Sequence, residues 1–164
     1  MARHDDDLKK FNKELSNAIE EVFKPNSLRE IGDFALERIV KRTKLGKGVS
    51  QSGGSASPLK SLAASYKKAR KRLKDSGDLS GDTSPGKSNL TRTGQMLDAG
   101  QVTGVSRDKV TLGFRGKRNE STLTNDAVAG YVSRDRPFFN LSKAEENAVS
   151  GEIERRLQEK LKKL

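Results

Sequence analysis

The most specific spacing of chemically useful residues lies at 81–88, which read Gly-Asp-Thr-Ser-Pro-Gly-Lys-Ser. This order is typical of a loop whose backbone amides and lysine hold nucleotide phosphates while the serine binds Mg²⁺. Such a loop needs a buried strand before it and a helix after it. Residues 70–80 are polar and basic, and residues 89–94 form no amphipathic pattern. We therefore expect a polar loop here and no nucleotide hydrolysis.

Few other residues in the sequence are of types and spacings that support catalysis or metal binding. His4 is the only histidine, it precedes the aspartates 5–7, and the chain has no cysteine. A single imidazole beside adjacent carboxylates lacks the convergent ligands of a metal site and cannot complete a catalytic triad. The pairs Glu20–Glu21 and Glu145–Glu146 are predicted to lie on solvated helix faces. We expect no enzymatic activity, no cofactor and no metal.

Positive charge is concentrated in one segment. The net charge is +11, and residues 41–74 carry eleven basic residues and no acidic one. A local surplus of one sign attracts a polyanion, whereas a spread surplus mainly aids solubility. We place seven of these cations on a predicted partner-contacting surface: Lys60, Lys67, Lys68, Arg70, Lys71, Arg72 and Lys74.

Two partners fit this basic surface. Tyr66 is the only aromatic residue near it and belongs to the apolar side, so base stacking is not expected. Contact with nucleic acid would involve phosphates and would weaken with salt. The other candidate is an acidic surface on a protein partner or a neighbouring subunit.

The N-terminal part, residues 5–74, is predicted to be helical. Apolar residues spaced by three and four predict a helix over 5–23, which Pro25 and Asn26 end. Ser27 and Glu30 form a capping box for a second helix, which ends near Leu45. Residues 46–57, rich in glycine and serine, predict a flexible loop.

A third helix is predicted to carry the basic face and to extend toward a partner. Ser57 is its cap and Pro58 occupies its first position. Its apolar stripe is predicted to consist of Leu59, Leu62, Tyr66, Ala69 and Leu73.

The C-terminal part contains a predicted small sheet. After a polar loop over 75–89, alternating residues at 101–105 and 109–114 predict a hairpin, and 127–132 a third strand. The sheet thus spans 100–132, and a capping box of Ser142 and Glu145 opens a last helix over 142–164. We expect one α+β domain over 1–164, with helices one, two and the last packed on an antiparallel sheet.

Composition supports a modest core and no membrane span. Only 32% of the residues are apolar and 5% are aromatic, so little surface is available to bury per residue and neighbouring subunits are expected to complete the fold. Nowhere do 18 apolar residues run together. We therefore expect a soluble intracellular protein.

Three stretches together resemble the tail-completion, or virion-morphogenesis, family of tailed bacteriophages. They are residues 57–72, the sequence Leu-Thr-Arg-Thr-Gly-Gln-Met-Leu at 90–97, and Arg-Pro-Phe-Phe-Asn-Leu-Ser at 136–142 followed by a helix. The resemblance implies a non-enzymatic virion protein, assembled in the host cytoplasm, that joins head to tail with other neck and tail proteins. It implies a homo-oligomeric ring of about six or twelve copies.

The resemblance also assigns structural residues. Thr93 and Gly94 would shape the turn that enters the sheet, and Arg136 with residues 137–139, Pro137, Phe138 and Phe139, would anchor the terminal helix or contact another subunit. Simple core packing accounts for the same residue types, since two phenylalanines supply a large apolar area. The alternative function is a free-standing basic nucleic-acid-binding module without sequence specificity.

Overall fold

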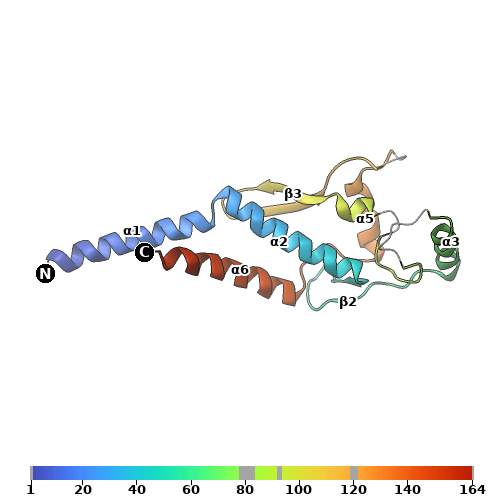
Figure 1. The fold of residues 1–164 in the computed structure, drawn as a ribbon, viewed down its shortest axis with the longest axis horizontal. Coiled ribbons are helices and arrows are strands. Elements are labelled where there is room, and N and C mark those ends of the chain that lie inside the picture. The colour runs from blue at the N-terminus through green and yellow to red at the C-terminus, as the bar shows by residue number, and fades with distance from the viewer. Residues whose placement is uncertain (1, 78–83, 92–93, 119–121, 164) are drawn as a thin grey trace.

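The computed structural model describes residues 2–77, 84–91, 94–118 and 122–163. This part of the chain contains helices and two small antiparallel sheets, so the α+β class is confirmed (Figure 1). In chain order the elements are α1 (Ala2–Val22), α2 (Pro25–Lys44), β1 (Lys47–Gly48), β2 (Ser57–Pro58), α3 (Ala64–Asp75), α4 (Gln95–Asp98), β3 (Gly100–Val105), β4 (Val110–Phe114), α5 (Asn125–Asp135) and α6 (Lys143–Leu161).

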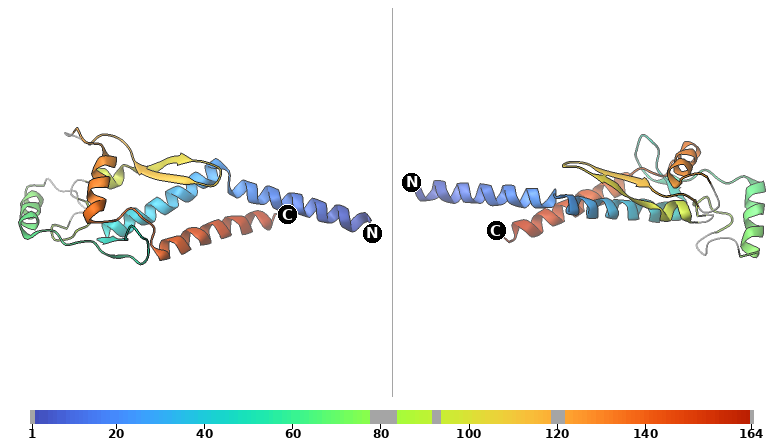
Figure 2. Two further views of the ribbon diagram at one scale, coloured as in Figure 1. Left: turned by 180° about the vertical axis from the view of Figure 1, so that it is seen from behind. Right: turned by 90° about the horizontal axis from the view of Figure 1, so that it is seen from above.

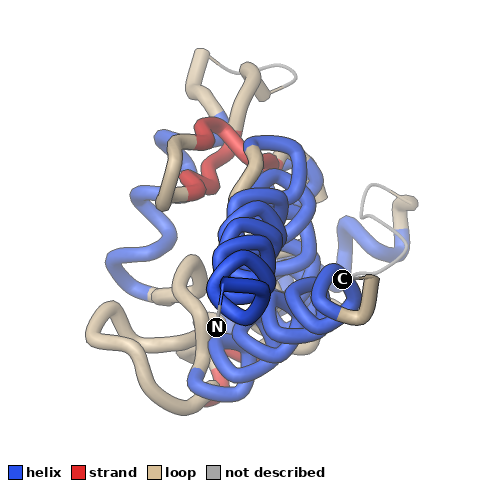
Figure 3. The backbone as a smooth tube through the Cα atoms, turned by 90° about the vertical axis from the view of Figure 1, so that its left-hand side faces the viewer, coloured by secondary structure: helices blue, strands red, loops and turns tan. Residues whose placement is uncertain are grey.

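The long helix α2 lies at the centre of the body. The β3–β4 hairpin packs on one side of α2 and α6 on the other, which is visible along the long axis in Figure 3. A Cβ at Gly32 of α2 would lie 2.6 Å from Val110 Cγ1 and 2.8 Å from Val102 Cγ2. Glycine at this position therefore lets the hairpin approach the helix directly.

Helix α1 departs from the predicted packing on the sheet. It packs mainly against α6, through the buried residues Ala18 and Val22, while α2 is the helix that packs on the hairpin. The N-terminal half of α1 extends beyond the end of α6 (Figures 1 and 2). None of the helices in the described ranges is both long and apolar enough to cross a membrane.

The hydrophobic core gathers around Phe138. Its side chain is fully buried, and its ring centroid lies 5.9 Å from that of Phe114, which in turn lies 4.6 Å from that of Phe139. Leu59 and Leu97 join the same cluster. The hairpin, α4, α5 and the segment before α6 therefore share one core.

The two predicted capping boxes have different outcomes. At α6 the box is confirmed, because Glu145 N donates to Ser142 Oγ at 3.3 Å and Ser142 N donates to Glu145 Oε2 at 2.7 Å. At α2 it is wrong: the helix begins at Pro25, whose fixed φ suits a first helical position. Ser27 and Glu30 instead accept hydrogen bonds from Arg156 of α6, at 3.3 and 2.6 Å.

The predicted third strand over 127–132 is wrong, because these residues lie in α5. Thr124 precedes this helix, and its hydroxyl accepts from Ala127 N at 3.2 Å. This cap supplies a partner for an amide that has none within the helix. The hairpin sheet therefore ends at Phe114 rather than extending to residue 132.

The predicted helix start at Ser57 is also wrong. Ser57 and Pro58 form β2, which pairs with β1, and Leu59 N donates to Gly46 O at 2.8 Å. Residues 46–57, which were predicted to form a flexible loop, thus include β1 and the first residue of β2, and these two strands pair with each other. Leu59 and Leu62 are both 8% exposed. We attribute the later start at Ala64 to this burial, which draws the segment onto the body before α3 begins.

Candidate partner-binding surface on the basic helix

Helix α3 lies at the end of the molecule opposite the N-terminus of α1 (Figure 1). Six of its twelve residues are basic and one, Asp75, is acidic. Five of the seven predicted contact residues are exposed: Lys60, Lys68, Lys71, Arg72 and Lys74. Lys67 is half-buried, so the structure brings most but not all of the predicted set to the surface.

Arg70 is the exception. It is only 2% exposed, its Nη1 donates to Lys87 O at 2.9 Å, and its guanidinium lies 6.0 Å from the Tyr66 ring centroid. The predicted apolar stripe placed Ala69 inward, but Ala69 is exposed. The inward side of α3 therefore contains Arg70, whose apolar stem is suited to packing and whose planar donors are suited to a buried carbonyl.

The exposed cations of α3 form a positively charged surface that an anionic partner is able to reach. Among the described residues, no carboxylate lies within salt-bridge distance of Lys68, Lys71 or Arg72. Arg72 and Lys74 occupy the last helical turn, where positive charge interacts favourably with the helix dipole. Lysine and arginine side chains so placed are able to bind phosphates or carboxylates without first breaking an internal ion pair.

Arg136 fixes the segment that leads into α3. Its Nε donates to Lys60 O at 3.2 Å and to Ser88 Oγ at 3.1 Å. Ser88 is buried, and residues 84–91 form turns rather than a helix, while the first part of the phosphate-loop match, 81–83, lies outside the described residues. Ser88 is thus positioned by a guanidinium, an unsuitable neighbour for a magnesium ligand.

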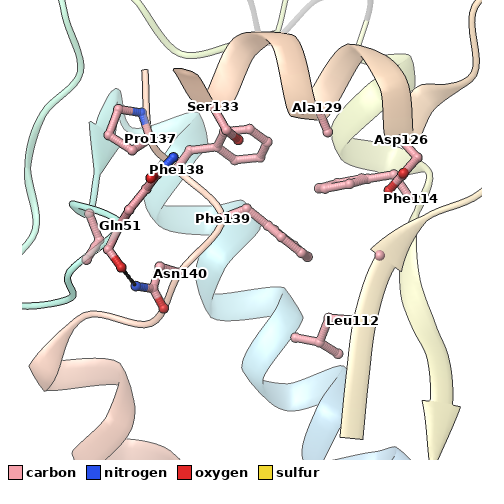
Figure 4. A pocket seen from close by; sticks show the side chains of 13 residues that line it. Gln51, Leu112, Phe114, Asp126, Ala129, Ser133, Pro137, Phe138, Phe139 and Asn140 are labelled. Carbon is pink, nitrogen blue, oxygen red and sulfur yellow. Dashed lines mark hydrogen bonds between the residues drawn. The ribbon is translucent and has the colours of Figure 1, made fainter. Parts of the chain in front are cut away.

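Pro137 and Asn140, which follow Arg136, hold the loop that contains β1 through hydrogen bonds. Val49 N donates to Pro137 O at 3.0 Å, and Asn140 Nδ2 donates to Ser50 O at 3.2 Å and to Gln51 O at 3.4 Å (Figure 4). A Cβ at Gly48 would lie 2.2 Å from Pro137 O. The close backbone approach therefore requires glycine at position 48.

A cavity of about 440 Å³ lies beside this segment and is shown in Figure 4. Phe114 and Phe139 line its apolar side, and Asp126, Ser133 and Asn140 contribute polar groups. Phe138 and Phe139 both line this cavity; Phe138 belongs to the buried core and Phe139 packs against it. Pro137 also lines the cavity.

A buried ion pair connects α2 to α6, and the sequence interpretation missed it. Arg42 Nη1 donates to Glu145 Oε2 and Nη2 to Phe138 O, and the two side chains are 7% and 9% exposed. Burial lowers the pKa of Arg42, and the Glu145 carboxylate partly offsets this effect. The predicted solvated position of Glu145 was wrong. The sequence contains one indication of this burial, because Arg42 follows Ala35 and Ile39 at helical spacing and so lies on the buried face of α2.

The predicted turn residues are only partly described. Gly94 is buried, directly precedes α4 and has φ of +74°, a conformation that favours glycine. Thr93 lies outside the described residues. Nearby, Thr91 Oγ1 donates to Asn89 Oδ1 at 2.8 Å, and both residues are buried.

No protein-family model, curated protein or solved structure matches this chain. Within the described ranges there is also no group of three or more histidines and carboxylates able to hold a metal ion.

Proposed function

We propose that this chain is a structural virion protein of a tailed bacteriophage that forms a ring at the head-to-tail junction and completes the tail. The observation that supports it is that the N-terminal half of α1 and helix α3 lie at opposite ends of an elongated molecule (Figure 1) and expose different side chains. Leu8 and Phe11 of α1 are 59% and 52% exposed, whereas α3 exposes cations. Exposed apolar surface is typical of a protein interface. One end thus suits a neighbouring protein and the other an anionic partner.

In this proposal the exposed cations of α3 contact DNA in, or entering, the channel of the ring. Lys68, Lys71 and Arg72 bind phosphates, because Tyr66, the one aromatic residue of α3, is 38% exposed but lies beside Arg70 rather than beside these cations. Binding is therefore independent of base sequence and weakens steeply with salt. Other neck and tail proteins are the neighbouring partners, and the mature location is the virion.

The alternative is a free-standing basic module that binds nucleic acid without sequence specificity. The same exposed cations of α3 favour it, but it leaves the exposed apolar residues of α1 without a role. Native mass spectrometry of the full chain separates the two functions. We expect a closed ring of about six or twelve copies. A chain that stays monomeric while it binds DNA would favour the alternative.

A second experiment tests the DNA contact. The triple variant Lys68→Glu/Lys71→Glu/Arg72→Glu should lose at least about tenfold in affinity for a duplex at low salt in a filter-binding assay. Arg70 is left intact because it is buried. The matched control Arg107→Glu/Lys109→Glu/Lys117→Glu changes the net charge equally at exposed sites outside α3. Equal losses in both triple variants would reject α3 as the DNA-binding surface and leave an acidic protein partner as its occupant.

A further inference from the structure

Arginines from three separate segments line one pocket between α3 and α5, two helices that lie at the same end of the molecule (Figure 1). Arg70 belongs to α3, Arg118 follows β4, and Arg136 follows α5. The pocket has a volume of about 460 Å³, which is in the range of small-molecule sites. None of the described residues that line it is acidic. We call this site the arginine pocket.

The positive charge of the arginine pocket is partly shielded from solvent. Arg70 is 2% exposed, and Arg118 and Arg136 are half-buried. Charges that are partly buried are screened by salt less than charges on an open surface. Three like charges beside one pocket repel one another, and an anion bound between them offsets this repulsion. The charge of the lining residues therefore favours an anionic ligand.

Arg136 has donors that are directed by the fold and are still available to a ligand. Its Nε donates to Lys60 O at 3.2 Å and to Ser88 Oγ at 3.1 Å, and these two bonds hold the planar guanidinium in place. Within the described ranges, its Nη1 and Nη2 donate to no group. A guanidinium with two terminal nitrogens available is suited to bidentate binding of a phosphate or a carboxylate.

The remaining walls of the arginine pocket are mostly apolar. They are formed by Leu62, Leu90, Met96, Val128 and Val132. Leu90 has φ of +57°, a conformation that is unfavourable for residues other than glycine and that occurs preferentially at ligand sites. Tyr66, which is 38% exposed, adds an aromatic ring to the lining. The pocket therefore offers an apolar environment directly beside its cations.

These two properties together define the ligand. A phosphate monoester has nearly two negative charges at neutral pH and three acceptor oxygens, whereas a carboxylate has one charge and two oxygens. Arginines from three segments match the phosphate better. We propose that the arginine pocket binds a small phosphate monoester whose organic group is aromatic or aliphatic. The phosphate accepts hydrogen bonds from Arg136, and the organic group packs against Met96, Val128 and Val132.

This site is separate from the proposed DNA-binding surface. Lys68, Lys71 and Arg72, the exposed cations of α3, do not line the arginine pocket. The proposal therefore goes beyond the proposed function, and the failure of one leaves the other standing. Lys68→Ala/Lys71→Ala/Arg72→Ala should keep its affinity for a phosphate monoester within about threefold, because these side chains are screened by solvent.

Calorimetric titration of the full chain with phenyl phosphate tests the ligand class. We expect phenyl phosphate to bind at least about tenfold more tightly than inorganic phosphate, benzyl alcohol or benzoate, because each of these lacks one of the matched features. Equal affinity for inorganic phosphate would exclude the apolar walls from the site, and equal affinity for benzyl alcohol would exclude the arginines. Equal or tighter binding of benzoate would exclude the preference for phosphate. Each of these results would overturn the proposal.

Two arginines close together in the sequence provide a matched test of the location. Arg136→Gln should weaken the binding of phenyl phosphate by at least about tenfold, because it removes a charge and two directed donors. Arg134→Gln makes the same change two positions earlier, at an exposed residue of α5 that does not line the pocket. This control should bind within about twofold of the parent. Equal losses in the two variants would overturn the proposal.

A second variant tests the pocket without removing the hydrogen bonds of Arg136. Ala63 lines the pocket and is exposed, so Ala63→Phe should fill part of the site while all three arginines remain. We expect at least about tenfold weaker binding of phenyl phosphate, with unchanged far-ultraviolet circular dichroism. Unchanged affinity in this folded variant would place the ligand elsewhere and would overturn the proposal.

Discussion

The basic residues of segment 41–74 divide into an internal and an external group. Arg42 and Arg70 are 7% and 2% exposed and bind backbone carbonyls, whereas Lys68, Lys71 and Arg72 face solvent. In the linear sequence the two groups are interleaved. Both internal members are arginines, whose planar group donates several hydrogen bonds while its stem packs on apolar surface. Charge density alone therefore does not distinguish a binding cation from a structural one.

The largest expected effect comes from leaving the buried Arg42 without its carboxylate. Glu145→Ala should lower the free energy of unfolding by about 3–5 kcal/mol, because the buried Arg42 guanidinium is then left without a carboxylate partner. Urea denaturation measures this loss. The double variant Arg42→Met/Glu145→Met removes both charges and should regain at least half of the lost stability. A double variant less stable than Glu145→Ala would contradict the desolvation argument.

A smaller effect separates two arginines of the same helix. Arg70→Met should cost about 1–3 kcal/mol, because Lys87 O loses a buried donor. The matched variant Arg72→Met, at an exposed position, should change stability by less than about 0.5 kcal/mol. Urea denaturation compares the two directly. Equal costs would remove the distinction between the internal and external groups.

Acid sensitivity should arise from an ion-pair cluster on α6. Side-chain hydrogen bonds from Arg155 and Arg156 lower the pKa of Glu152 from its ordinary 4.5 to about 2. The ionised carboxylate therefore stabilises the fold fully above pH 4.5, and this contribution decreases as the pH falls toward 2. Solvent screening limits it to about 1 kcal/mol.

Glu152→Gln tests this contribution. The variant should be less stable than the parent at neutral pH, and the difference should shrink between pH 4.5 and 2. Thermal unfolding across this range measures the change. A difference that stays constant with pH would show that packing, rather than ionisation, accounts for the role of Glu152.

The smallest effect on stability should come from the external group. Lys68→Ala/Lys71→Ala/Arg72→Ala should change the free energy of unfolding by no more than about 0.5 kcal/mol, because these are surface positions. If α3 binds DNA as proposed, the slope of log affinity against log salt should decrease in magnitude by about 3. An unchanged slope with unchanged stability would remove these cations from the DNA interface.

The sequence was sufficient where local signals agreed with the fold. Apolar spacing placed α1, α2 and α6 closely, alternation placed the β3–β4 hairpin, and Ser142 with Glu145 marked the start of α6. These signals act over a few residues. The sequence also placed most of the exposed cations of α3 correctly, because lysines on a short amphipathic helix are seldom buried.

One of the failures depends on a local cap, and the other two depend on distant partners. The apolar run at 127–132 is compatible with strand or helix, and the cap at Thr124 decides for the helix. Burial of Leu59 and Leu62 displaces the start of α3. Arg42 and Glu145 are 103 positions apart, so no local pattern pairs them.

The distance between those two partners also sets an order of events during synthesis. Chains emerge from the N-terminus first, so α2 is made long before the carboxylate that neutralises Arg42. Until Glu145 is made, the central helix lacks both its ion-pair partner and the α6 surface that covers it. The packing around α2 is therefore completed only after α6 has been made.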